Sequence, residues 1–477
     1  MKNGLSLSAF PKTFRDAIAI TSRLQVRYLW IDSLCIIQNS REDWAKESGL
    51  MCSVYGNSHC NIAATAASNS SEGCFTANPR QTKDARRPFA VRIDWDGWQG
   101  AYCAHQSGRD IWDELDGAPL NARAWVHQER LLSPRVVHFG LSQLAWECNE
   151  VRVAELSPPG TSVPARGIRE FSKQGCASMW IRSEARGPLG SKEFLQRWGY
   201  VWSKYAGLRL TRETDRLVAL AGIVDKIQPV LKDDFLAGLW RRDLEQQLCW
   251  WTPVPCDRRH GTFIAPSWSW ASLPDRNAMQ DWVAWEDEKI CLLKIVDVQI
   301  WSDPDGSKYT TTAGFVRARC YLVPATRIYG QWTQILVFSP AGGSITLDLH
   351  LYLDCEEDNK IPHIWCVPIL ARDDIGSDSF GGWLDGLLLE KLDNGNPADQ
   401  QYRRCGYFVV QDSWRGTNIR AFWNATFYFN QYQASPEYHD GVWRISEKWL
   451  MDGSTLDEHL SLYERRDREV QHTITIW

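Results

Sequence analysis

The feature that most constrains the fold is an alternation of short apolar runs with amphipathic segments in the first part of the chain. Residues 12–23 and 41–56 place apolar side chains at helical spacing, whereas residues 28–32 and 60–66 are short apolar runs. Residues 136–139 form a further run of this kind. Strands that alternate with helices belong to a parallel sheet covered on both faces. The three runs are therefore predicted to lie parallel in one α/β sheet.

The composition divides the 477 residues into three stretches, a number that the length also favours. Residues 1–150 carry the α/β pattern, and residues 151–260 begin with a Pro/Gly/Ser-rich linker and continue with amphipathic helices. Residues 261–477 alternate Val, Ile, Trp, Tyr and Thr with Gly, Pro and Asn breaks, which is typical of antiparallel strands. We expect an α/β domain, a helical region and a β-rich region. Residues 68–100, rich in Ser, Asn, Arg and Gly, are expected to form a loop insertion.

Charge, hydropathy and cysteine usage exclude several classes of protein. The net charge of −5 provides no basic field that would attract nucleic acid. All apolar runs are far shorter than the ~18 residues of a membrane helix, and no signal-peptide pattern is present, so we expect a cytoplasmic protein. The 14 cysteines form no C-x-x-C pair, and no histidine pair has zinc-ligand spacing. No metal site is therefore predicted, and the thiols are expected to be reduced and mostly buried.

Two motif blocks carry a resemblance to a known family. In the first, residues 30–32 read WID, residues 35–38 read CIIQ, and the following helix closes on Met51 and Tyr55. The second block, residues 123–135, reads RAWVHQERLLSPR. Together the two blocks resemble the HET domain, the heterokaryon incompatibility module of filamentous fungi.

The resemblance extends beyond these blocks but has one departure. Residues 211–223, which read TRETDRLVALAGI, and residues 265–272, which read APSWSWAS, also resemble stretches of these proteins. The family normally opens with a strand reading roughly Y-x-x-L-S-x-x-W-G, and nothing before Pro11 matches it. We therefore expect the sheet to lack this first strand and to present an edge that invites pairing with another chain.

The resemblance implies a fold related to TIR domains, with a flavodoxin-like parallel sheet. Some TIR domains hydrolyse NAD at the nicotinamide–ribose bond with a helical glutamate that lies four residues after a tryptophan. Trp125 and Glu129 have this spacing, and residues four apart share one face of a helix. A carboxylate beside the ribose stabilises an oxocarbenium-like transition state. The resemblance thus implies that Glu129 is catalytic and that NAD is a substrate, with no tightly bound cofactor.

Three further residues are candidates for binding NAD in one cleft with Glu129. Trp125 could stack on the nicotinamide, and Asp32 is expected at the carboxyl end of a strand, where open α/β sheets gather ligands. Gln38 lies in the loop that follows. Each candidate also has a structural alternative: Trp125 could be a core residue, Asp32 a cap, and Gln38 a loop hydrogen-bonder. Glu129 could pair with a nearby arginine, namely Arg123, Arg130 or Arg135.

Two functions therefore remain open. The first is an NAD-consuming enzyme that causes cell death, and the second is a non-catalytic signalling module that acts by protein–protein assembly. Under either function, the resemblance implies self/non-self recognition, with a protein trigger that the sequence does not identify and with self-association as a further expectation.

Overall fold

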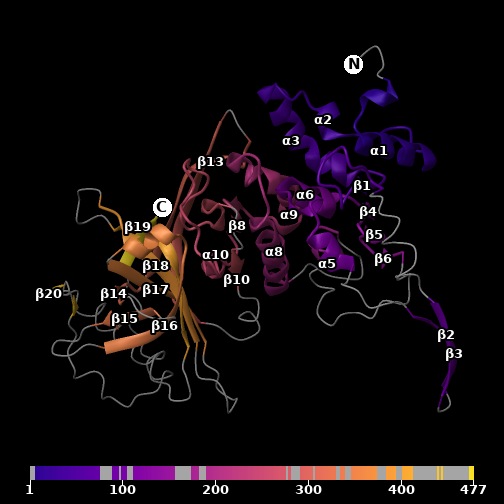
Figure 1. Cartoon of the computed structure of the whole chain (residues 1–477). Helices are drawn as coiled ribbons and strands as arrows, with labels where there is room; N and C mark the ends of the chain where they lie inside the picture. The colour runs from indigo at the N-terminus through magenta and orange to yellow at the C-terminus, as the bar shows by residue number, and fades with distance from the viewer. Residues whose placement is uncertain are drawn as a thin grey trace. The chain divides into compact units, whose positions relative to one another are not determined.

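The chain forms two compact units, each assembled from two separate stretches of sequence. Unit 1 comprises Met1–Leu189 and Leu208–Lys232, and unit 2 comprises Gly190–Gly207 and Asp233–Trp477. Figure 1 shows their helices and strands. The computed structural model describes residues 6–75, 89–95, 98–104, 111–155, 173–181, 190–274, 278–280, 290–304, 307–328, 334–338, 345–361, 363–372, 383–393, 400–411, 438–439, 442–443 and 472–477.

Unit 1 contains a four-stranded sheet in the order β1, β4, β5, β6. Its strands are β1 (Asn61–Ala63), β4 (Arg135–Phe139), β5 (Leu144–Cys148) and β6 (Arg152–Ala154). β1 and β4 are parallel, and the other two neighbouring pairs are antiparallel. A mixed α/β fold with parallel strands in this part of the chain is therefore confirmed. The parallel relation predicted between residues 60–66 and 136–139 is confirmed as well.

Three helices of unit 1 pack against one another, namely α3 (Arg41–Gly56), α6 (Ala124–Leu132) and α9 (Ala221–Leu231). Gly222 marks their closest approach, because a Cβ atom there would lie 2.7 Å from Gln128 Oε1 and 3.4 Å from the Cα of Cys52. The remaining helices of unit 1 are η1 (Leu7–Ala9), α1 (Lys12–Arg23), α2 (Asp32–Cys35), α5 (Ile111–Asp116), η2 (Leu120–Ala122), α7 (Lys173–Ala177), η3 (Glu213–Asp215) and η4 (Val218–Leu220).

The strand predicted at residues 28–32 is absent, and this prediction was wrong. Tyr28 is 78% exposed, and helix α2 already begins at Asp32, whose carboxylate accepts a hydrogen bond from the backbone N–H of Ser33 at 2.7 Å. A strand requires backbone partners, and residues 28–31 pair with no strand in the described part of the chain. Apolar character alone therefore misled the prediction.

The loop expected over residues 68–100 was also wrong in its second half. Strands β2 (Phe89–Trp95) and β3 (Trp98–Ala104) form an antiparallel hairpin there. The two runs are rich in strand-forming residues, and the sequence between them is Asp-Gly, a hairpin signal that outweighs the polar composition of the region.

Unit 2 is built on a ten-stranded sheet, which confirms the β-rich C-terminal region. The order is β11, β17, β14, β15, β16, β19, β22, β13, β12, and β18 pairs with both β17 and β19. All pairs are antiparallel except β19 with β22. The strands are β11 (Ile290–Cys291), β12 (Lys294–Ser302), β13 (Thr311–Cys320), β14 (Val323–Ile328), β15 (Gln334–Phe338), β16 (Ile345–Leu353), β17 (His363–Arg372), β18 (Trp383–Lys391), β19 (Gln401–Gln411) and β22 (His472–Ile476).

Unit 2 contains further elements among its described residues. They are α8 (Ser191–Ala206), β7 (Phe235–Leu236), β8 (Leu239–Trp240), α10 (Leu244–Gln247), β9 (Trp250–Trp251), η5 (Trp270–Ser272), β10 (Met279–Gln280), η7 (Glu356–Lys360), β20 (Tyr438–His439) and β21 (Val442–Trp443). The predicted helical character of residues 151–260 thus appears as α7, α8, α9 and α10, interrupted by short strands.

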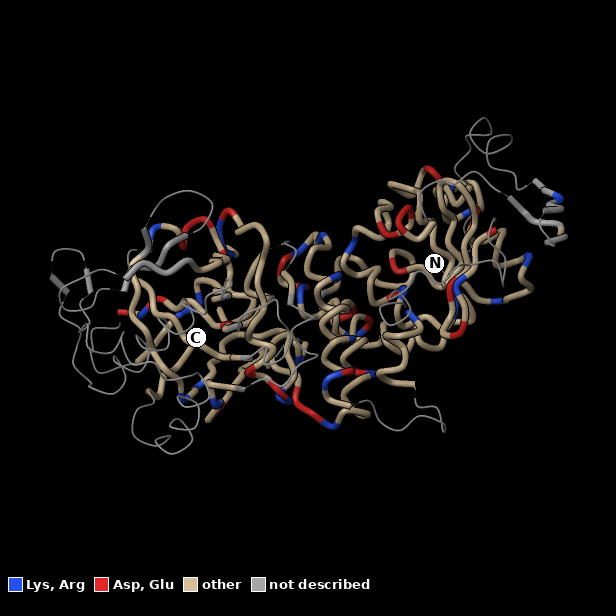
Figure 2. The backbone as a smooth tube through the Cα atoms, turned by 90° about the horizontal axis from the view of Figure 1, so that it is seen from below, with Lys and Arg blue, Asp and Glu red and all other residues tan. Residues whose placement is uncertain are grey.

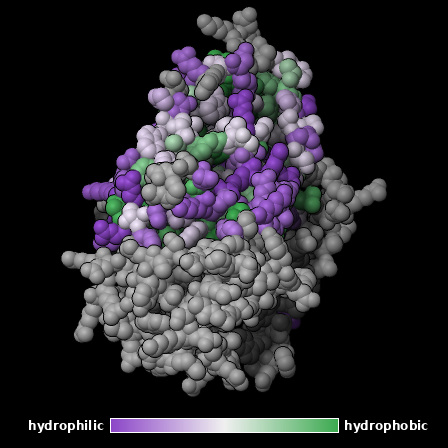
Figure 3. Space-filling view, turned by 90° about the vertical axis from the view of Figure 1, so that its left-hand side faces the viewer, coloured by the Kyte–Doolittle hydropathy of each residue, from purple (hydrophilic) through white to green (hydrophobic). Residues whose placement is uncertain are grey.

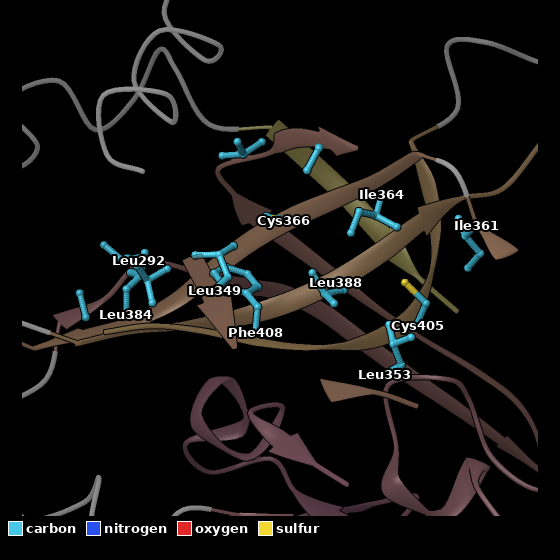
Figure 4. Close-up of a cluster of buried hydrophobic side chains, with 14 residues drawn as sticks. Leu292, Leu349, Leu353, Ile361, Ile364, Cys366, Leu384, Leu388, Cys405 and Phe408 are labelled. Carbon is cyan, nitrogen blue, oxygen red and sulfur yellow. The ribbon is translucent and has the colours of Figure 1, made fainter. Parts of the chain in front are cut away.

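The core of unit 2 combines aliphatic side chains with buried charge. Leu349, Leu388 and Phe408 belong to an aliphatic and aromatic cluster on the large sheet (Figure 4). Arg404 is fully buried, and its guanidinium donates to Asp354 and to the carbonyl oxygen of Leu248. Because both charges are paired and hydrogen-bonded, the network can sit in the interior without an uncompensated ion.

One cysteine pair departs from the reduced thiols predicted above. Cys256 and Cys355 form a disulfide, with Cα atoms 4.4 Å apart and a sequence separation of 99. That separation leaves no local pattern from which the pairing could be predicted.

The described surface mixes both signs of charge. Figure 2 shows Lys and Arg interspersed with Asp and Glu along the backbone. On the face drawn in Figure 3, hydrophilic residues cover most of the described surface, and apolar residues form small separate spots. Within the described ranges, no helix is long and apolar enough to cross a bilayer, as the sequence predicted.

Candidate functional site

The candidate site is centred on Glu129, where helices α3 and α6 of unit 1 meet. Tyr55, in the last turn of α3, acts on the Glu129 carboxylate, and each of the two side chains shifts the pKa of the other. Met51, one turn before Tyr55, is 6% exposed, so the M-x-x-x-Y spacing directs this face of α3 inward. The ring of Trp30 packs edge-on against Tyr55, with centroids 5.6 Å apart. Segments remote in sequence thus converge on one carboxylate.

The ionisation of Glu129 is shifted into the neutral range. Burial is the largest cause and raises its pKa to about 7. The hydrogen bond from Tyr55 and the charge of Arg123 oppose the rise, whereas the charge of Asp32 adds to it. Burial, followed by the charge of Glu129, raises the pKa of Tyr55 well above its usual range, so Tyr55 remains a neutral donor. At neutral pH the site therefore holds a carboxyl group that is present in both protonation states.

Asp32 lies at the start of α2 and is exposed. Its carboxylate accepts the N–H of the adjacent Ser33 at 2.7 Å, so Asp32 is a local hydrogen-bond acceptor and not the N-cap, which is Ile31. Its charge nevertheless acts on both Tyr55 and Glu129. The structure thus brings Asp32 into the neighbourhood of Glu129, although from a helix start rather than from the strand end predicted.

Gln38 is exposed and bonds within its own loop. Its side-chain amide donates to the carbonyl oxygen of Ile36 at 3.0 Å and to that of Asp32 at 3.5 Å. Asp43 accepts the N–H of Ile37 at 2.7 Å and holds the other side of the loop. These contacts give Gln38 the loop-bracing role of the structural alternative, and its proposed contact with NAD stays a prediction.

Trp125 shares α6 with Glu129 and is partly buried. Its indole N–H donates to Asp215 Oδ2 at 3.4 Å, and the ring of Trp44 meets it edge-on at 6.4 Å. Asp215 belongs to η3, in the second stretch of unit 1. This stretch is tied to the start of α6, because the N–H of Ala124 donates to the carbonyl oxygen of Arg209 at 2.9 Å. The second stretch therefore anchors Trp125 from outside the motif blocks.

The next residue of α6, Arg130, belongs to a different cluster. Its guanidinium donates to both carboxylate oxygens of Glu147, at 3.1 and 2.7 Å, and to Asp116 at 2.9 Å. Burial alone would raise the pKa of Glu147, but the charge and hydrogen bonds of Arg130 lower it to about 2. Lys173 adds its ammonium group to the last turn of α6, where it donates to the carbonyl oxygen of Leu131 at 3.1 Å.

This arrangement bears on the ion-pair alternative for Glu129. Arg130 is engaged with Glu147, and Arg135 donates to the carbonyl oxygen of His59 at 3.2 Å. Among the described residues, Arg123 is the arginine whose charge acts on Glu129. The catalytic role of Glu129 stays a prediction, but two of the three arginines that could have neutralised it have other partners.

Three residues at this site had no role predicted from the sequence. Tyr55 and Trp30 appeared only as letters of the first motif block, and Asp215 only as a letter of the stretch at 211–223. Only their positions in these motifs could have pointed to them, since the Trp125–Asp215 and Trp30–Tyr55 contacts join residues far apart in sequence.

In the described part of the chain, no group of three or more His, Cys, Asp or Glu side chains is arranged to hold a metal ion.

Comparison with known proteins supports the resemblance carried by the motifs. Residues 2–129 match the family model described as Heterokaryon incompatibility protein (HET). The matched range includes Asp32 and Tyr55 and ends at Glu129, whereas Asp215 lies outside it. No curated protein and no solved structure matches the chain. The match confirms the predicted resemblance to the HET domain over this range.

Proposed function

We propose that this chain is a cytoplasmic effector of incompatibility-type cell death that hydrolyses NAD at the nicotinamide–ribose bond, with Glu129 as the catalytic carboxylate. The single observation that carries the proposal is the state of Glu129. Glu129 is a partly buried carboxyl group with a pKa of about 7, and the neighbouring Arg130 binds another carboxylate, that of Glu147. Buried carboxyl groups with such a shifted pKa cluster at functional sites.

The reaction follows from the chemistry of a carboxylate beside a ribose. The bond between C1′ and the pyridinium nitrogen breaks, and its electron pair leaves with nicotinamide, which becomes neutral. Positive charge develops on the ribose and is stabilised by the Glu129 carboxylate. Water then adds to C1′ and releases one proton, so NAD and water become ADP-ribose, nicotinamide and a proton. In this scheme Trp125 offers an aromatic surface to the nicotinamide, and Asp32 and Gln38 border the site.

The test is Glu129→Gln in the whole chain. The amide keeps the shape and can still accept the hydrogen bond of Tyr55, but it cannot carry the negative charge. NAD hydrolysis, followed as nicotinamide released from purified protein, should fall roughly 10²- to 10³-fold. In the unmodified protein the rate should rise with pH and reach half of its plateau near pH 7, because the reaction uses the ionised carboxylate.

The matched control is Glu42→Gln, which changes an exposed glutamate in the first turn of α3. It should leave the rate and its pH dependence unchanged. Equal rates for the Glu129→Gln protein and the unmodified protein would remove Glu129 from the mechanism.

A second candidate, a non-catalytic module that acts by assembly, is favoured by one observation. Unit 1 exposes large apolar side chains at Leu24, Tyr28, Ile37 and Leu50. Exposed apolar surface can form a protein–protein contact. Killing by the Glu129→Gln protein with unchanged cellular NAD would favour this candidate. Self-association measured by light scattering, lost on Tyr28→Ser and Ile37→Ser, would then identify the surface.

A further inference from the structure

One face of the large sheet in unit 2 carries a row of aromatic side chains across three neighbouring strands. The ring of Trp301 on β12 lies 5.8 Å from the ring of Phe315 on β13. The ring of Phe315 lies 5.4 Å from that of Trp477, the residue after β22. Phe315 is 7% exposed, whereas Trp301 is 43% exposed and Trp477 is 37% exposed. This aromatic row therefore presents an indole ring to solvent at each end.

The strand pairing places three cations beside the aromatic row. Residues two apart along a strand share one face, and so do paired residues of neighbouring strands. Arg317 and Arg319 therefore lie on the face of Phe315, and Lys294 joins them because it pairs with Arg319. All three cations are exposed. The alternate residues of the same strands are buried against the core, namely Val298, Val316 and Ile474.

The acidic groups near this face do not cancel its positive charge. The guanidinium of Arg317 lies 5.4 Å from the centre of the Phe315 ring, and none of the three cations forms an ion pair with a described carboxylate. Asp297 lies on the same face and accepts the side-chain amide of Gln299 at 3.3 Å. Glu245 lies at the strand edge, where it accepts a backbone N–H of β12 at 3.2 Å. Three cations against these two acids leave a local positive excess in a chain whose net charge is −5.

We propose that this face of β12, β13 and β22 binds single-stranded RNA. Aromatic rings on the face of a sheet stack on unpaired bases, and cations beside them attract the phosphates. The aromatic row and the three cations supply both kinds of contact. The polar side chains of Gln299 and Thr475 lie on the same face and can hydrogen-bond the ribose 2′-hydroxyl, which distinguishes RNA from DNA. The net charge, from which no nucleic-acid partner was expected, describes the whole chain and not this surface.

The experiment measures the affinity of the whole chain for a fluorescein-labelled uridine oligonucleotide of about twelve residues, by fluorescence anisotropy at several salt concentrations. Trp301→Ala should weaken binding roughly 5- to 100-fold, because one stacked base loses its ring. Arg317→Gln should weaken binding and reduce the slope of log affinity against log salt by about 0.7, because one phosphate contact is lost. Since Arg317 is exposed, this variant tests the site even where Trp301→Ala disturbs the fold.

The matched controls are Phe263→Ala and Arg241→Gln, which change an exposed ring and an exposed guanidinium elsewhere in unit 2. They should leave the affinity and the salt slope unchanged. Absence of binding at low salt, or binding that both test variants leave intact, would overturn the proposal. Equal affinity for heparin or for duplex RNA would also overturn it, since neither offers unpaired bases, and equal affinity for a thymidine DNA oligonucleotide would reject the assignment to RNA. Loss of self-association by Trp301→Ala, with RNA binding unchanged, would assign the face to a second copy of the chain instead.

Discussion

Glu129 and Glu147 are two carboxylates of unit 1 whose pKa values are shifted in opposite directions. Burial raises the pKa of both, but Glu147 receives the guanidinium of Arg130 and its pKa falls to about 2. Burial raises the pKa of Glu129, which is adjacent to Arg130 in sequence, to about 7, because the opposing effects of Tyr55 and Arg123 are each smaller. The partner, and not the extent of burial, separates a structural ion pair from a group poised to titrate. The same substitution should therefore have opposite effects on stability at the two positions.

The largest expected effect is that of Glu147→Gln. It leaves Arg130 buried without its main counter-charge, and removing one partner of a buried ion pair costs about 3–5 kcal/mol. The pKa of Glu147 in the folded state lies below its usual value. The stabilisation from this ion pair is therefore present above about pH 4.5 and is lost as the pH falls towards 2. Hydrogen exchange of peptides from α6, at pH 7 and in increasing urea, reports on unit 1 separately from unit 2. Protection equal to that of the unmodified chain would contradict a structural role for this ion pair.

Glu129→Gln should change stability in the opposite direction. The pKa of Glu129 in the folded state lies above the usual 4.5. Its contribution to the stability of the folded state is therefore fully present below pH 4.5 and is lost as the pH rises to about 7. At pH 8 the charged carboxylate therefore costs about 2–3 kcal/mol, after allowance for its partial exposure. The variant should be more protected than the unmodified chain at pH 8 and equally protected at pH 4.5, in the same exchange measurement. Destabilisation by both glutamine variants at pH 8 would erase the distinction between the two sites.

Asp215→Ala should have the smallest effect. It removes the acceptor of the Trp125 indole N–H, a long contact of 3.4 Å, and should cost about 1 kcal/mol of protection in α6. If Trp125 binds nicotinamide, the KM for NAD should rise by about 3- to 10-fold, with kcat nearly unchanged. Asp225→Ala, on α9 of the same unit, is the control. A kcat loss as large as that expected for Glu129→Gln would mean that Asp215 acts on the carboxylate and not on the ring.

The sequence predicted those parts of the site that depend on local periodicity. Helices α1 and α3 followed from apolar spacing, and the W-x-x-x-E spacing correctly placed Trp125 and Glu129 on one helix, α6. It could not predict that Glu129 meets Tyr55, because that contact depends on how two helices pack. The run at 28–32 failed for a related reason, since an apolar run becomes a strand only where another strand pairs with it.

Long-range pairing also limited what could be predicted elsewhere. The disulfide of Cys256 with Cys355 and the bidentate contact of Arg130 with Glu147 join residues that no local motif connects. The sequence does not show which residue a charged side chain pairs with in the fold. For this reason the three arginines near Glu129 could not be distinguished until their positions in the fold were known.

The contribution of residues 208–232 to unit 1 has a consequence for how the protein is made. Helix α9 supplies Gly222, at which α3 and α6 close on each other, yet it follows Glu129 by roughly a hundred residues. At a ribosomal rate of about 5–20 residues per second, α3 and α6 emerge roughly 5–20 seconds before their third partner. During that interval the surface of α3 and α6 that packs on α9 is uncovered, and transiently exposed apolar surface of this kind favours aggregation.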